Sequence, residues 1–274
     1  MFHDQFAFRR RLYHGRPKLS ITLLYTYLKT HRSVHLIALD FSKAFDTVKH
    51  HPLASFARKI ANFPISDNVY NWVINFLSSR QHKTKANGCI STCQHIDASI
   101  VHGSGMGPVA YLLNASDLQP IDQDNMIFKY ADDTYLIVPG SNIQTIPMEL
   151  QHISKWTMCH KLELNETKSK EIIISLLKTH IPAATHLTRV ESLKVLGVTF
   201  NTKLSFKPHI SYIIQSAARS FYGFKTLRAH GLTGKSLRDV TRATLIARII
   251  YAAPAWCMGI LTCCGEGPHR VGYQ

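Results

Sequence analysis

The chain has 274 residues, and 45% of them are hydrophobic, which excludes a disordered chain and allows one large domain or two smaller ones. Its 32 Lys and Arg residues outnumber 17 Asp and Glu residues, giving a formal net charge of +15. This excess favours a polyanionic partner, because phosphates release counterions when basic side chains bind them. A basic surface that contacts only solvent is the alternative.

Six scattered cysteines and an N-terminal stretch without an apolar secretory core predict a reducing, intracellular setting, and the sequence does not separate nucleus from cytoplasm. Cys89, Cys93 and His95 lie close together, but no second ligand pair follows at zinc-finger spacing, so zinc is the less favoured interpretation. The uncharged segment from Ile249 to Gly265 is short for a membrane span and contains Pro254. We expect a buried helix and an irregular tail there; a membrane span is the alternative.

The first half of the chain alternates helical and strand patterns. Apolar spacing predicts helices over Leu19–Lys29, Pro52–Asn62 and Asn68–Ser79, with Ser66 or Asp67 as the cap of the third. His35–Asp40 has the short apolar pattern of a buried strand. Gln81–Ile100 predicts a hairpin, because Asn87-Gly88 is a strong turn signal. His102–Pro108 predicts a glycine-rich loop, and an apolar helix-like run follows it through Leu118.

The second half begins with two strands, Met126–Ala131 and Thr134–Val138, separated by little more than Asp132 and Asp133. This pattern predicts a tight hairpin with the two aspartates at its turn. The remaining elements expected in chain order are a helix over Pro147–Lys161, strands over Glu171–Leu176 and Leu193–Phe200, and helices over Pro208–Arg228 and Lys235–Tyr251. The pattern thus predicts a mixed α/β body followed by a smaller helical part.

Asp40 ends one predicted strand, and Asp132 and Asp133 form the predicted turn of another pair. If these strands are neighbours, three carboxylates converge at one edge of a sheet, and their repulsion favours a divalent cation. Ligation by oxygen alone suits Mg²⁺, and two ions about 4 Å apart can clamp a phosphoryl displacement. A surface turn is the alternative for an isolated Asp-Asp pair.

Several motifs occur in one order along the chain, and the series resembles the reverse transcriptase domain of non-LTR (LINE-type) retrotransposons, particularly the jockey-like elements. The motifs are ALDFSKAFDTVKH (38–50), the Gly-Ser-x-x-Gly-Pro stretch (103–108), YADD (130–133), LELNETKSK (162–170) and LKVLGVTF (193–200). The likeness covers about residues 5–256. It implies an α+β right-hand polymerase fold with a palm, partial fingers and a helical thumb.

The resemblance also assigns roles to residues around the palm. Asp40, Asp132 and Asp133 match the three catalytic aspartates, and the carbonyl of Phe41 would complete the coordination of one of two Mg²⁺ ions, with Mn²⁺ as a possible substitute. Phe45 matches the bulky residue that excludes a ribose 2′-OH. A core aromatic is the alternative for Phe45 considered alone.

Further matches concern the nucleotide and the nucleic acid. His102 and Gly103 fall where the family usually has Gln-Gly, in the loop that contacts the incoming dNTP. Lys168, with Asn165, matches an Asn-x-x-Lys pattern near the triphosphate. Leu196 and Gly197 match the hairpin that grips the primer. The thumb cations expected at the duplex are Arg219, Lys225 and Arg228; each is alternatively an exposed side chain without that role.

The resemblance divides the chain into partial fingers and palm over residues 1–202, a helical thumb-like region over 203–260 and an irregular tail over 261–274. Finger segments that precede the Gln5 region in the family are absent, so we expect a fragment of a retroelement. The predicted activity is RNA-directed DNA synthesis from dNTPs on an RNA template and a DNA primer. An inactive remnant that still binds nucleic acid is the main alternative, and a metal-dependent nuclease is another.

Overall fold

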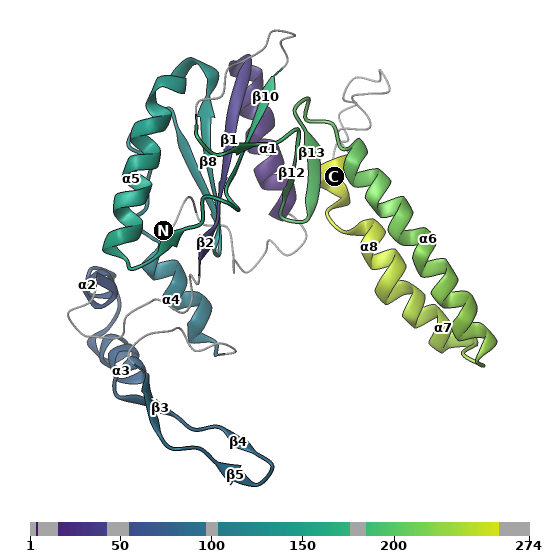
Figure 1. Cartoon of the computed structure of the whole chain (residues 1–274), viewed down its shortest axis with the longest axis horizontal. Coiled ribbons are helices and arrows are strands. Elements are labelled where there is room, and N and C mark those ends of the chain that lie inside the picture. Colours follow the sequence, from purple (N-terminus) through teal and green to yellow (C-terminus); the bar gives the residue numbers. More distant parts are fainter. Residues whose placement is uncertain (1–3, 5–15, 43–54, 97–103, 176–184, 258–274) are drawn as a thin grey trace, which may run out of the picture.

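The computed structural model describes residue 4 and residues 16–42, 55–96, 104–175 and 185–257, and in residues 16–20 and 55–56 it describes the backbone alone. A twisted sheet forms the centre of the molecule (Figure 1). A β-hairpin extends from one end of the molecule, and a pair of long helical segments extends from another (Figure 1). The body therefore carries two arms, and the sheet lies between them.

Five strands build the central sheet in the order β11-β10-β1-β8-β7. The strands are β1 (Ser33–Leu39), β7 (Met126–Tyr130), β8 (Asp133–Pro139), β10 (Lys170–Ser175) and β11 (Thr188–Arg189). The pairs of β1 with β8 and with β10 are antiparallel, whereas β10 and β11 run parallel. The strand expected over 35–40 is thus the central one, and Asp40 follows its last residue.

The sheet is buried on both faces, which explains why its strands are almost continuously apolar. Ile37 and Leu39 pack on one face with residues of α4 (Met106–Asn114) and α5 (Ile146–Cys159). Val34 and Leu36 pack on the other face with α1 (Arg16–Thr30). Alternating side chains of β1 therefore contribute to two separate cores.

The hairpin arm consists of residues 80–96, next to the helices α2 (Ser55–Ala61) and α3 (Asp67–Leu77). It contains β3 (Arg80–His82) paired with β6 (Gln94–Ile96), and β4 (Lys85–Ala86) paired with β5 (Cys89–Ile90). Asn87 and Gly88 have φ angles of 48° and 79°, as a tight hairpin turn requires. The hairpin predicted around Asn87-Gly88 is confirmed.

The helical arm consists of residues 207–250. It contains α6 (Lys207–Ala229), α7 (Gly234–Thr241), the π-helical turn η2 (Arg242–Ile246) and α8 (Ala247–Ile250). β12 (Ser192–Val195) and β13 (Val198–Asn201) form a hairpin that packs between the helical arm and the sheet. Side chains of the helical arm and of the sheet belong to the same hydrophobic core as those of the hairpin. The remaining elements are β2 (Phe41–Ser42), β9 (Glu163–Leu164) and η1 (Gly140–Thr145).

Three sequence predictions differ from the structure. The expected strand over 193–200 is two strands, because Leu196 and Gly197 adopt positive φ angles of 46° and 85° and reverse the chain. The expected loop over 102–108 ends early, since α4 begins at Met106. Pro108 is tolerated there because the first helical turn needs no intrahelical N–H donor. Ser66 precedes α3 but makes no capping side-chain hydrogen bond.

The segment expected as a buried helix from Ile249 is also different. Helix α8 ends at Ile250, whose side chain is 62% exposed, and burial resumes only at Ala252, Ala255 and Trp256. Residues 258–265 lie outside the described part. Within the described ranges, no helix combines the length and apolar character that crossing a membrane requires.

Candidate functional site

Two carboxylates meet where β1 ends and β8 begins. Leu39 of β1 pairs with Thr134 of β8 in the antiparallel register. Asp40 follows Leu39 and Asp133 precedes Thr134, so both acids occupy the next position at the same end of the same strand pair. The sheet therefore brings together two residues that are 93 positions apart in the sequence (133 minus 40).

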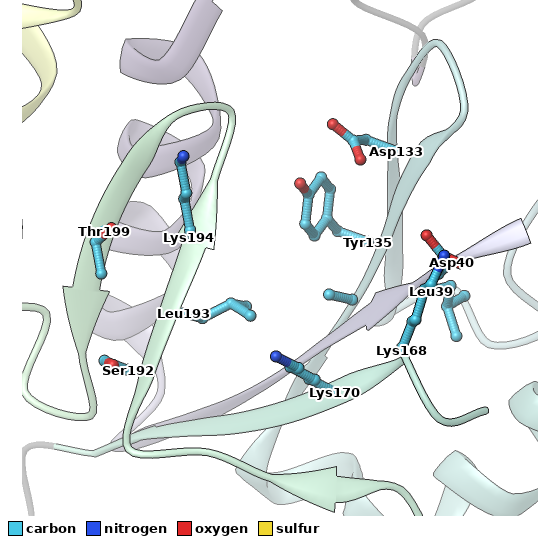
Figure 2. Close-up of a pocket in the computed structure, with 11 residues that line it drawn as sticks. Leu39, Asp40, Asp133, Tyr135, Lys168, Lys170, Ser192, Leu193, Lys194 and Thr199 are labelled. Carbon is cyan, nitrogen blue, oxygen red and sulfur yellow. The ribbon is translucent and has the colours of Figure 1, made fainter. Parts of the chain in front are cut away.

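Both acids open on a cleft of about 370 Å³ between the sheet and the β12–β13 hairpin (Figure 2). Strand alternation places Asp133 on the same side of β8 as Tyr135, and Asp40 continues the side of Ala38. The residues that line this cleft are Ala38, Leu39, Asp40, Asp133, Tyr135, Lys168, Lys170, Ser192, Leu193, Lys194 and Thr199. One wall is the central sheet, and the opposite wall is the hairpin.

The electrostatics of the cleft reflect mutual repulsion between acids. The pKa of Asp133 is raised, first because the cleft removes water from its partly exposed carboxylate and then by the negative charges of Asp132 and Asp40. The pKa of Tyr135 is also raised, first by burial and next by the charge of Asp133. A positive charge placed between the acids would relieve this repulsion.

Three lysines line the same cleft, and sequence reasoning identified only Lys168. Lys170 pairs with Ala38 across β1 and β10, a register that the sequence does not disclose. Lys194 alternates with the buried Leu193 and Val195, a pattern that signals exposure but not its position at the cleft. Two carboxylates and three ammonium groups make the cleft suitable for a phosphate-bearing substrate with a cation.

Asp132 occupies a different position from its neighbour. The β7–β8 pairing ends at Tyr130 and Asp133, so the turn consists of Ala131 and Asp132, and Ala131 has a φ angle of 53°. The sequence predicted that both aspartates form the turn, but Asp133 is the first residue of β8. Asp132 does not line the cleft; its charge acts on buried Tyr111, whose pKa is raised first by burial and then by Asp132 and Asp133.

The segment 165–169 folds around the backbone of Asp40. The side-chain oxygen of Asn165 accepts hydrogen bonds from the hydroxyl of Thr167 and the backbone N–H of Lys168. The two residues of the Asn-x-x-Lys pattern thus have different roles: Asn165 stabilises the turn, and Lys168 lines the cleft. Ser169, which sequence reasoning missed, is fully buried and bonds the backbone N–H of Asp40.

The other predicted site residues lie in several places. The ring of Phe41 is buried in the core and packs against Trp156 with ring centroids 6.2 Å apart. Leu196 and Gly197 form the turn of the β12–β13 hairpin. Arg219, Lys225 and Arg228 are exposed on α6 of the helical arm and do not line the cleft. Phe45, His102 and Gly103 lie outside the described residues.

In the part of the chain that the structure describes, no group of three or more His, Cys, Asp or Glu side chains is arranged to hold a metal ion. Neither the set of Cys89, Cys93 and His95 nor the set of Asp40, Asp132 and Asp133 forms such a group. In the hairpin arm, the Cys93 thiol contacts the Gln81 side-chain oxygen, and Gln81 also contacts His95.

Solved structures with the same architecture define the class of this fold. An apo telomerase from Candida tropicalis has a TM-score of 0.53 and 14% identity, over 75% of this chain and 37% of that one. A telomerase from the same organism in complex with the TWJ fragment of telomeric RNA has a TM-score of 0.53 and 12% identity, over 96% of this chain and 44% of that one. The fold is that of a right-hand polymerase.

The sequence pattern of the family "Reverse transcriptase (RNA-dependent DNA polymerase)" matches residues 1–200. The chain belongs to the reverse transcriptase family. It is 27% identical over 230 residues to the RNA-directed DNA polymerase from mobile element jockey of Drosophila melanogaster, covering 77% of this chain and 25% of that protein. It is 24% identical over 242 residues to the probable RNA-directed DNA polymerase from transposon BS of the same organism, covering 82% and 26%. The chain thus spans about a quarter of the length of these relatives.

Proposed function

We propose that this chain is the RNA-directed DNA polymerase domain of a non-LTR retroelement, which joins a dNTP to the 3′-OH of a DNA primer on an RNA template. The observation that carries this proposal is the position of Asp40 and Asp133 at one end of one strand pair, facing a cleft with three lysines. The named polymerase relatives support it, and so does the formal net charge of +15.

The donor set of the cleft suits Mg²⁺. Protein Mg²⁺ sites commonly use one or two carboxylates together with water and substrate phosphates, rather than a complete cage of side chains. The pKa of Asp133 is raised first by burial and then by the negative charges of Asp132 and Asp40, and a divalent cation would offset these charges. We propose Asp40, the carbonyl of Phe41, Asp132 and Asp133 as the ligands of two Mg²⁺ ions, with Mn²⁺ as a possible substitute. When bound, such ions polarise the phosphate and lower the pKa of the attacking hydroxyl.

The remaining roles belong to the side chains around the cleft. Lys168 is proposed to neutralise negative charge on the departing pyrophosphate, as its exposed position at the cleft supports. Phe45, His102 and Gly103 are proposed to contact the sugar and base of the dNTP, by resemblance alone. Leu196 and Gly197 are proposed to hold the primer strand. Of the three α6 cations that the resemblance assigns to the duplex, Lys225 and Arg228 are proposed to contact its backbone, because Lys225 points away from α8 and Arg219 lies on the face opposite Arg228.

We also propose the domain organisation that the resemblance implies. Residues 1–202 would form partial fingers and palm, 203–260 a thumb, and 261–274 an irregular tail. The start of the helical arm at Lys207 supports the boundary between residues 202 and 203. A reducing, intracellular setting is proposed as well, and the free thiols of Cys89, Cys93, Cys159 and Cys257 support it.

Primer extension on an RNA template with Mg²⁺ tests the function. Asp133→Asn and Asp40→Asn should each lower the extension rate by about a hundredfold or more, since a lost metal ligand costs several kcal/mol of transition-state stabilisation. Asp239→Asn, which alters an exposed acid of α7, is the matched control and should extend like the wild type.

The alternatives give different outcomes. A wild-type chain that binds primer–template in an anisotropy assay but adds no nucleotide is an inactive remnant. Shortening of the labelled strand without extension would indicate a metal-dependent nuclease. Equal extension by the wild type and Asp133→Asn would refute the metal assignment.

A further inference from the structure

Two tyrosines hold the turn between β12 and β13. The hydroxyl of Tyr251, at the end of α8, donates a hydrogen bond to the carbonyl oxygen of Leu196 over 3.0 Å. The backbone of the same Leu196 also acts on the phenol of Tyr135, which belongs to β8 and lines the cleft. The backbone of one turn residue is therefore joined both to the central sheet and to the helical arm.

Gly197 allows this contact with Tyr251. A Cβ atom at position 197 would lie 2.9 Å from the Cε1 atom of the Tyr251 ring and 3.4 Å from its hydroxyl oxygen. The φ angle of Gly197 is 85°, a conformation that favours glycine on its own account. The ring thus lies directly against the turn, and a side chain at this position would displace it.

Tyr251 is itself fixed by its surroundings. Its carbonyl oxygen accepts a hydrogen bond over 3.0 Å from the indole N–H of Trp256, which belongs to the core shared with β12 and β13. Arg248, three residues earlier, donates to the hydroxyl of Ser216 on α6 over 2.6 Å. Tyr251 therefore connects the end of α8 to the hairpin turn, and Arg248 connects the same helix to α6.

A second cavity, of about 400 Å³, lies beside this connection. Its lining includes Gly197 and Tyr251, together with Tyr212 of α6 and Thr244 of η2. The cavity and Tyr251 lie on the same side of the turn, where the hydrogen bond and the ring contact of Tyr251 hold it. The other side of the hairpin forms the wall of the cleft, through Lys194 and Thr199.

We propose that Tyr251 is a positioning residue that couples the helical arm to the cleft. By holding the Leu196–Gly197 turn, it fixes the hairpin wall that faces Asp40 and Asp133. This inference rests on the proposed polymerase function, in which the hairpin holds the primer. A displacement of the helical arm then moves the hairpin wall, so the position of the arm sets how tightly the cleft holds its primer–template.

The test compares Tyr251→Phe, which removes only the hydroxyl, with Tyr212→Phe, which alters a half-exposed tyrosine on the same second cavity. For Tyr251→Phe, the KM for primer–template should rise about three- to tenfold, the effect of one lost hydrogen bond, while kcat changes much less. The number of nucleotides added per binding event should fall. Tyr212→Phe should match the wild type, and equal behaviour of the two variants would overturn the proposal.

A second measurement needs no nucleic acid and separates this proposal from the proposed function. Amide hydrogen exchange of residues 192–201 should be faster in Tyr251→Phe than in the wild type or in Tyr212→Phe. If the wild type does not extend a primer, the polymerase function fails, and the exchange result alone decides the coupling. Unchanged exchange in Tyr251→Phe then overturns it, and faster exchange confined to this hairpin supports it.

Discussion

The hydroxyl of Ser169 accepts a hydrogen bond from the backbone N–H of Asp40 over 3.1 Å and donates one to the carbonyl oxygen of Asn165 over 2.8 Å. The backbone N–H of Asn165 donates to the carbonyl oxygen of Asp40 over 2.8 Å. The turn 165–169 therefore holds the backbone of Asp40 on both sides of its Cα atom and so helps to orient its side chain.

We predict that Ser169→Ala destabilises the protein and slows primer extension. The substitution leaves the part-buried backbone N–H of Asp40 without its acceptor, which costs about 1–3 kcal/mol. A misplaced Asp40 should lower the extension rate by about tenfold or more, since small displacements of a catalytic group are costly. Urea denaturation and primer extension measure the two effects.

Thr167→Ala is the control for this prediction. The Thr167 hydroxyl bonds the Asn165 side chain over 2.7 Å in the same turn, but it is exposed and does not bond Asp40. We expect a change within about 0.5 kcal/mol, as for most surface substitutions. Equal losses in both variants would show that the turn as a whole, rather than the Ser169–Asp40 bond, is responsible.

The three cations of α6 should contribute unequally to nucleic-acid binding. Arg219 and Arg228 are nine residues apart, which is two and a half helical turns, so they lie on opposite faces. Lys225 is nine residues from Ser216, which faces Arg248 of α8, so it points away from that helix. In the double variant Lys225→Gln with Arg228→Gln, the slope of log K for primer–template binding against log salt concentration should fall in magnitude by about one for each lost phosphate contact.

Arg219→Gln provides the matched control on the same helix. We expect its plot of log K against log salt concentration to keep the slope of the wild type. A reduced slope for Arg219→Gln with an unchanged slope for the double variant would place the duplex on the opposite face of α6.

The fully buried pair of His35 and Glu171 joins β1 to β10, with 2.8 Å between Nδ1 and Oε1. We predict that Glu171→Leu alone lowers the free energy of unfolding by about 1–3 kcal/mol, because it leaves the buried Nδ1 atom of His35 without its hydrogen-bond partner. The double variant His35→Leu with Glu171→Leu should recover most of this loss, since apolar residues suit that core. Denaturation of the wild type, the two single variants and the double variant in a double-mutant cycle measures the coupling energy. Additive losses of stability from the two single substitutions would contradict the prediction.

His209 should make stability fall in acid. It is 4% exposed, and neither ring nitrogen has a hydrogen-bond partner in the described part of the chain. Its pKa is lowered, first by burial and then by the positive charge of Lys194. The unfolded state therefore takes up a proton near pH 6.5 that the native state resists, so the free energy of unfolding decreases as pH falls through this value.

Denaturation between pH 7.5 and 5.5 checks this sign. His209→Leu should show a shallower pH dependence than the wild type, because the proton uptake of the unfolded state at this position is removed. His82→Gln, at an exposed position of the hairpin arm, is the control and should keep the wild-type slope. An unchanged slope in His209→Leu would contradict the prediction.

The sequence predicted most elements because their patterns are local. The Asn87-Gly88 turn, the YADD hairpin and the amphipathic α5 were all recognised from residues adjacent in the chain. The errors arose where neighbours did not decide the conformation. Leu196 is an ordinary strand residue by composition, and its positive φ angle follows from its place with Gly197 in the two-residue turn between β12 and β13.

The candidate site shows the same division. Its acids could be predicted from their order along the chain, but Tyr135, Lys170 and Lys194 could not, because their place at the cleft depends on strand register and on the hairpin that covers the sheet. Asp132 and Asp133 are adjacent in sequence, yet only Asp133 lines the cleft. Asp132 belongs to the turn and Asp133 to β8, so adjacency in the chain does not place both side chains at the cleft.

The amino-acid sequence by itself determined the family, the order of the motifs and the basic charge, since these are properties of the residues and their spacing. Only the tertiary structure decided which side chains share a cleft and which residues hold them. The antiparallel register of β1 and β8 joins Asp40 to Asp133, and Ser169 and Tyr251 act across long stretches of chain. Such contacts depend on how separate segments pack, and no local pattern encodes that packing.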